Sequence, residues 1–153
     1  MKTGIIIYSQ TGHTRQAALR LQETLKAKGR EAELLEVKVS NSQPTTNAGL
    51  VQLTNKPEVD GFDQLVFAAP VWGFSLSAVM KAYLAGLPSL KGKKISLFVT
   101  HQLPLPFMGG NAAIRQMKNL CEEKGGQVTA HAVISWGEKR RESDISGMLN
   151  KLG

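Results

Sequence analysis

The chain has 153 residues with 42% hydrophobic content, which suits one compact core and predicts a single domain over residues 1–153. One cysteine excludes an internal disulfide framework, and no cysteine and histidine residues have the spacing of a zinc site, so no metal site is predicted. The net charge of +7 admits nucleic acid as a partner, but the basic residues are scattered as on an ordinary solvated surface, and we expect no nucleic-acid binding.

The first ten residues, MKTGIIIYSQ, contain one lysine and a short apolar run that ends at Ser9. They lack the small-residue cleavage pattern of a signal peptide. No apolar stretch approaches the length that spans a bilayer. We therefore expect a cytoplasmic protein without a membrane partner.

Short apolar runs rich in β-branched residues recur along the chain. Residues 4–8 are apolar on both faces, as in a strand that helices cover on both sides. Residues 31–37 alternate polar and apolar, which predicts an edge strand. The predicted strands are residues 4–8, 31–37, 65–69, 95–99 and 128–134.

Helical stripes of apolar residues follow every predicted strand except the second. The first stripe, over residues 14–28, closes with a basic last turn and Gly29, a common helix stop. Residues 39–62 are irregular, and we expect a long loop there with a short helix around residues 48–53. The other predicted helices lie around residues 76–87, 114–121 and 145–152.

Strands that alternate with helices predict an α/β fold, a doubly wound five-stranded parallel sheet with helices on both faces. Ligands of such sheets bind beyond the carboxyl ends of the strands, where the strand order reverses. The site is therefore expected in the segments after the first, third and fourth strands.

The segment after the first strand is hydroxyl-rich and opens a helix. Its hydroxyls, its glycine and the helix amides suit a phosphate group, and an ordinary helix cap is the alternative reading. The Walker and GxGxxG patterns are absent, which favours a single phosphate monoester. The residues are Ser9, Gln10, Thr11, Gly12, His13 and Thr14.

The segments after the third and fourth strands supply aromatic and polar groups. Trp72 and Phe74 are placed to stack on a planar ring, with core packing as the alternative. The polar residues after the fourth strand are placed to read the heteroatom edge of such a ring. Together the three segments predict a phosphorylated planar cofactor. The residues are Pro70, Val71, Trp72, Gly73 and Phe74, then Thr100, His101 and Gln102.

In these residues the chain resembles the flavodoxin family. The family's phosphate loop, [TS]xTGxT, is matched by SQTGHT, and APVWGFSLSAVMKAYL, residues 69–84, resembles its second flavin loop and following helix. The resemblance implies a flavodoxin-like fold with strand order 2-1-3-4-5 and non-covalent FMN. The implied contacts are the phosphate on Ser9 to Thr14, the ring flanked by Pro70 to Phe74, and the pyrimidine edge near Thr100 to Gln102 with Gly109 and Gly110.

The resemblance implies a redox protein that carries electrons through FMN to a partner protein or a small-molecule acceptor. Familiar carrier flavodoxins are acidic, whereas this chain is basic, so an FMN-dependent NAD(P)H:quinone or flavin reductase is the alternative. A flavin-free interaction module of the same fold is a further alternative. A phospho-acceptor receiver domain is set aside because no carboxylate follows the first or third strand.

The sequence also suggests roles for three individual side chains. His13 stands where the family often has asparagine, and its imidazole either offsets the phosphate charge when protonated or points to water. Cys121 lies in a helical stripe and reads as a buried hydrophobe rather than a nucleophile. His101 is a hypothetical proton donor, and no catalytic residue is assigned.

Overall fold

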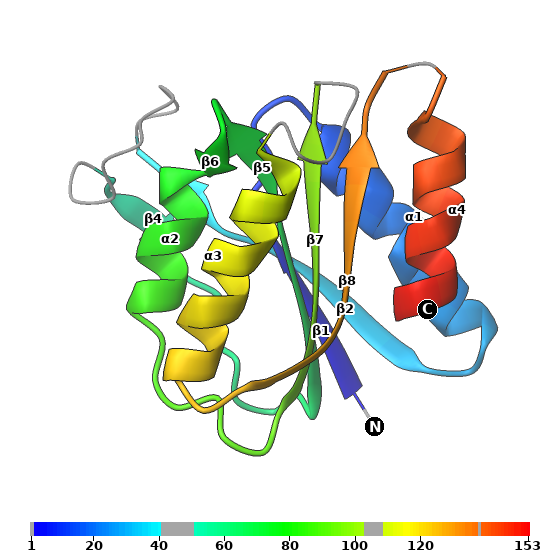
Figure 1. Cartoon of the computed structure of the whole chain (residues 1–153). Coiled ribbons are helices and arrows are strands. Elements are labelled where there is room, and N and C mark those ends of the chain that lie inside the picture. The colour runs from blue at the N-terminus through cyan, green and yellow to red at the C-terminus, as the bar shows by residue number, and fades with distance from the viewer. Residues whose placement is uncertain (1, 41–50, 103–108, 138) are drawn as a thin grey trace.

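The sheet at the centre of the fold is built from the five strands that the sequence predicts (Figure 1). The computed structural model describes residues 2–40, 51–102, 109–137 and 139–153. Five parallel strands lie in the order β2-β1-β5-β7-β8. The predicted strand order and the edge position of the second strand are confirmed. The bounds are β1 Lys2–Ile7, β2 Glu31–Glu36, β5 Gln64–Trp72, β7 Lys94–His101 and β8 Gln127–Ser135.

Helices cover both faces of this sheet (Figure 1). One face packs against α1 (His13–Ala27) and α4 (Arg141–Leu152), and the other packs against α2 (Ala78–Ala85) and α3 (Gly110–Glu123). Successive side chains of a strand point to opposite faces. In β1, Ile5 and Ile7 therefore join one core and Ile6 joins the other. This two-sided burial explains why the run is apolar at every position.

A short hairpin extends the third predicted strand. The third predicted strand continues through Trp72 and turns back as β6 (Ser75–Leu76), which pairs antiparallel with β5. The two-residue turn begins at Gly73 with φ +63°, and tight hairpins favour glycine at this position. The residues that follow the third predicted strand therefore form a hairpin at the carboxyl end of β5.

The irregular region also contains a small separate sheet of β3 (Lys38–Val39) and β4 (Leu53–Asn55). The predicted helix around residues 48–53 lies partly outside the described residues. Over residues 51–53 it is wrong, because Leu53 begins a strand. The amide of Ser40 donates to the carbonyl of Gln52 at 3.0 Å, and this pairing favours the extended conformation.

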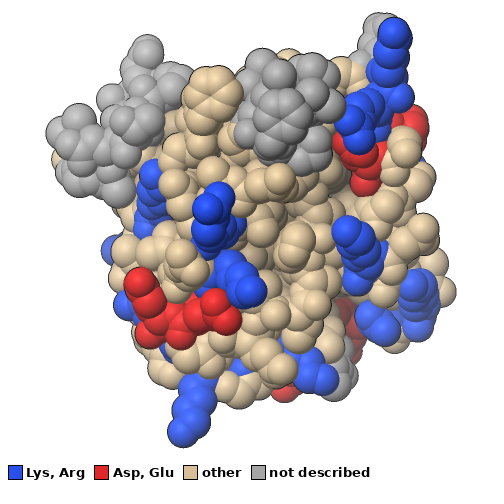
Figure 2. Space-filling model, in the orientation of Figure 1, with Lys and Arg blue, Asp and Glu red and all other residues tan. Residues whose placement is uncertain are grey.

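None of the helices that the structure describes is both long enough and apolar enough to cross a membrane. Figure 2 shows lysine and arginine side chains spread over one face, with acidic side chains and neutral surface among them. The absence of nucleic-acid binding stays a prediction that this distribution favours.

Cys121 lies in α3 and is fully buried. Burial, and secondarily the neighbouring Glu122 carboxylate, raises the pKa of its thiol to about 12. Because the thiolate is the reactive form, we expect the folded protein to resist a thiol reagent at mildly alkaline pH and to react fully after unfolding in guanidinium. Colorimetric titration of the thiol checks this expectation. Rapid labelling of the folded protein would contradict the buried placement.

Candidate functional site

The loop between β1 and α1 is organised around the hydroxyl of Ser9. Its Oγ accepts hydrogen bonds from the amides of Gly12 at 3.2 Å and Arg15 at 3.3 Å. Gly12, the N-cap of α1, has φ +94°, a conformation that glycine adopts without strain. The Ser9 hydroxyl therefore caps the N-terminus of α1, which is the alternative role that the sequence indicates for this loop.

Other amides at the start of α1 stay open. Within the described parts of the chain, the backbone N–H groups of Thr11, His13 and Thr14 donate to no acceptor. Unpaired amides at a helix N-terminus form an anion site that the helix dipole strengthens. The loop thus contains both a cap and a set of donors that fits a phosphate group.

The hydroxyl of Thr14 has a different role from the one expected for it. It is buried and lies 2.8 Å from the hydroxyl of Thr100 at the end of β7. This bond joins the start of α1 to the carboxyl end of a strand two positions away in the sheet. The Thr14 side chain therefore holds the start of α1 against the end of β7, and only the backbone amide of Thr14 remains open for a phosphate group.

The carboxyl end of β5 brings aromatic residues to the same edge. Trp72 is 9% exposed, and its ring meets Tyr8 edge-on, with the centroids 5.7 Å apart at 88°. Phe74, at the tip of the hairpin, is 68% exposed. The two predicted stacking residues therefore differ in burial: Trp72 is part of the packed edge of the sheet, whereas Phe74 projects into solvent.

The three segments meet around a cavity of about 150 Å³. Three lining residues come from the segment that runs from the end of β1 to the first residue of α1, three from the end of β5, and three from the end of β7 and the residue after it. Among these described lining residues there is no carboxylate, and every one of them belongs to the predicted site. They are Gln10, Thr11, His13, Pro70, Val71, Trp72, Thr100, His101 and Gln102.

The remaining predicted residues support the cavity and do not line it. Gly109 caps α3 with φ +105°, and a Cβ there would lie 2.7 Å from Cα of Phe74. A Cβ on Gly110 would lie 2.6 Å from a methyl group of Val133. Both glycines allow α3 to begin close to the hairpin and to β8. Contact of either glycine with a ring edge stays a prediction.

His13 lies at the border between the loop and the end of β8. Its ring stacks on Trp136, with centroids 4.6 Å apart and planes at 15°, and its Nδ1 is 3.4 Å from the side-chain amide of Gln102. Burial lowers the pKa of His13, and the guanidinium of Arg141 lowers this pKa further. His13 is thus held by an aromatic surface, and its surroundings favour the neutral imidazole.

Arg141 completes this arrangement at the start of α4. Its guanidinium lies over the Trp136 ring, 4.8 Å from the centroid. Its Nε and Nη2 both donate to the carbonyl of Trp136, at 3.0 and 2.9 Å. The sequence reading missed Trp136, although it follows the fifth predicted strand and so had to lie at the same sheet edge.

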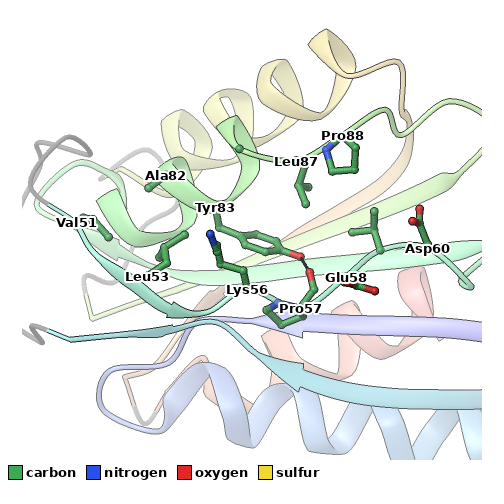
Figure 3. Close-up of a pocket in the computed structure, with 12 residues that line it drawn as sticks. Val51, Leu53, Lys56, Pro57, Glu58, Asp60, Ala82, Tyr83, Leu87 and Pro88 are labelled. Carbon is green, nitrogen blue, oxygen red and sulfur yellow. Dashed lines mark hydrogen bonds between the residues drawn. The ribbon is translucent and has the colours of Figure 1, made fainter.

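A larger cavity of about 600 Å³ lies beside α2 (Figure 3). It flanks the C-terminal half of that helix and the segment that leads into β5. The Tyr83 hydroxyl donates to the carbonyl of Pro57 in its wall, and burial raises the pKa of this phenol. None of the predicted site residues lines it, so size alone does not identify the functional site.

Comparison with known proteins identifies the family. Residues 1–141 match the family described as NADPH-dependent FMN reductase. This chain belongs to that family. The predicted cofactor, FMN, and the predicted flavodoxin-like redox function are thereby confirmed. Among curated proteins, none matches this sequence.

Solved structures with the same fold include several flavoproteins. A flavoprotein from Bacteroides uniformis has a TM-score of 0.71 and 15% identity over 98% of each chain. A flavodoxin from Streptococcus pneumoniae has a TM-score of 0.66 and 17% identity over 99% of this chain and 97% of the other. A Lactobacillus acidophilus flavoprotein in complex with FMN has a TM-score of 0.64 and 19% identity over 95% and 97%. At these identities the likeness shows a shared flavodoxin-like fold.

Proposed function

We propose that this member of the NADPH-dependent FMN reductase family, with residues 1–153 as one FMN-binding domain, transfers electrons from NADPH through FMN to a quinone or a free flavin. The family match over residues 1–141 carries this proposal. The charge supports it as well. None of the described residues that line the cavity is acidic, and the chain carries a net charge of +7. A basic protein suits an anionic dinucleotide better than docking on a basic redox partner.

The FMN phosphate is assigned to the loop of Ser9 to Thr14, because the amides of Thr11, His13 and Thr14 at the start of α1 have no acceptor among the described residues. The ring is assigned to the wall that ends β5, with its pyrimidine edge toward the end of β7. A buried polar atom in the cavity wall supports this fit, because Nδ1 of His101 has no partner among the described residues. A bound ring edge supplies such a partner.

Bound FMN supplies the hydride-transfer chemistry between nicotinamide and acceptor. In the net reaction NADPH loses a hydride and leaves as NADP⁺, while a quinone gains two electrons and two protons to become a quinol. One proton comes from solvent. The protein binds and orients the cofactor through its amides, and the walls at the ends of β5 and β7 exclude water from one side of the site.

Anaerobic mixing of the FMN-loaded protein with NADPH tests this function. We expect the visible flavin absorbance to bleach, and to return when a soluble quinone is added. Free FMN at the same concentration is the control for reaction without protein. If dithionite bleaches the bound flavin but neither NADPH nor NADH does, the protein is an electron carrier and the reductase proposal fails.

A further inference from the structure

His101 is the last residue of β7 and is only 5% exposed. Its ring is fixed from the side that faces β8, where Nε2 lies 3.2 Å from the hydroxyl of Ser135. Its carbonyl accepts a hydrogen bond from the amide of Trp136 at 2.8 Å. The position of this imidazole is therefore determined by the backbone and by one side chain of the neighbouring strand.

The other nitrogen of the same ring has no hydrogen-bond partner among the described residues. Nδ1 is buried, and His101 forms part of the cavity wall together with Pro70, Trp72 and Thr100. An unpaired buried donor or acceptor destabilises the folded protein, so native proteins seldom keep one without a functional reason. A partner that binds in the cavity removes this cost.

Ser135 is itself held in place by α4. Its amide donates to Oδ2 of Asp144 at 2.9 Å. Burial lowers the pKa of His101, while the carboxylate of Asp144 raises it and Arg140 lowers it. A neutral imidazole carries one proton, and a hydroxyl that donates to Nε2 leaves that proton on Nδ1. With Ser135 as the donor, Nδ1 would be a buried N–H group that has no partner among the described residues, on a side chain that lines the cavity.

We propose that Ser135 positions His101 so that Nδ1 donates a hydrogen bond to the pyrimidine edge of bound FMN and thereby favours the reduced cofactor. This inference rests on the ring placement in the proposed function. Reduced flavin gains negative charge at this edge, so a donor there stabilises the reduced form more than the oxidised form. Within this scheme His101 contacts the cofactor, and Ser135 is a positioning residue.

The test is the midpoint potential of bound FMN in His101→Leu, measured by equilibration with a reference dye. We expect the preference for the reduced form to fall about tenfold, which lowers a two-electron potential by about 30 mV. The affinity for FMN and the affinity for riboflavin should fall equally, because the lost contact is to the ring and not to the phosphate. His131→Gln, an exposed histidine of β8, is the matched control and should keep the wild-type potential.

Ser135→Ala and Ser135→Thr form a second test that does not depend on the folding of the leucine variant. Ser135→Ala should lower the potential, as His101→Leu does. Ser135→Thr keeps the hydroxyl and should have a potential close to that of the wild-type protein. An unchanged potential in Ser135→Ala, or in a folded His101→Leu protein, would overturn the inference. If wild-type protein still holds FMN and NADPH still reduces it, the proposed function survives that result.

Discussion

Replacing Phe67 by alanine is expected to lower the free energy of unfolding by about 3–5 kcal/mol. Phe67 is fully buried in β5, the central strand, where it pairs with Ile6 on one side and Leu97 on the other. Its ring also meets Tyr83 of α2, with centroids 6.3 Å apart. Removal of the ring leaves a cavity between the sheet and α2 that rigid strands cannot close. A domain of this size has about 5–15 kcal/mol of stability, so much of it would be lost.

Urea unfolding of the flavin-free protein, followed by far-ultraviolet circular dichroism, measures this loss. Phe74→Ala is the matched control, because this phenylalanine is 68% exposed at the hairpin tip. Its effect on stability should stay within about 0.5 kcal/mol. A loss below about 1 kcal/mol for Phe67→Ala would mean that the centre of the sheet is not packed as described.

Replacing Thr11 by glutamate should weaken FMN binding on the order of 100-fold, or about 2–3 kcal/mol. Thr11 is an exposed residue of the loop to which the phosphate is assigned, so the substitution should have little effect on folding. The new carboxylate would lie beside the doubly charged phosphate at the entrance to α1. Riboflavin lacks the phosphate, so its affinity should change little.

Thr11→Gln is the matched control for this charge effect, because it has nearly the same size as glutamate and no charge. It should weaken FMN binding much less than Thr11→Glu does, because it removes the hydroxyl without adding a negative charge. Titrations of both variants with FMN and riboflavin, followed by flavin fluorescence, give the four dissociation constants. If Thr11→Glu weakened both flavins equally, the loop would be acting on the ring and the phosphate assignment would be wrong.

Much of the fold follows from local patterns in the sequence. The run of residues 4–8 is apolar on both faces because Ile5 and Ile7 enter one core and Ile6 enters the other. The run of residues 31–37 alternates polar and apolar because its strand lies at the edge of the sheet, where only some of its side chains are covered. Once these strands and the helices between them are recognised, the rule for parallel sheets fixes where the site must lie.

The parts that were missed depend on partners far away in the chain. The Thr14 hydroxyl bonds to Thr100, which is 86 positions away, and no local pattern indicates that pairing. The stacking of His13 on Trp136 joins the first helix to the end of the last strand. Leu53 becomes part of a strand because residues 38–40 offer an edge to pair with, although its neighbours in sequence suggested a helix.

The role of His101 shows a similar limit. Its place in the site was predicted, because it follows the fourth strand. The sequence could not indicate that one ring nitrogen, Nε2, forms a hydrogen bond with Ser135. Nor could it indicate that the other, Nδ1, is buried without a partner among the described residues. That difference between two atoms of one side chain arises only from the packing of β7 beside β8.

Titration of the flavin-free protein with FMN and with riboflavin, followed by quenching of flavin fluorescence, tests the assignment of the phosphate loop most directly. Three open amides at a helix N-terminus should favour the phosphate ester by about 100-fold or more. A clear preference for FMN of this size would support the loop of Ser9 to Thr14 as the phosphate site. Equal affinities for FMN and riboflavin would contradict it.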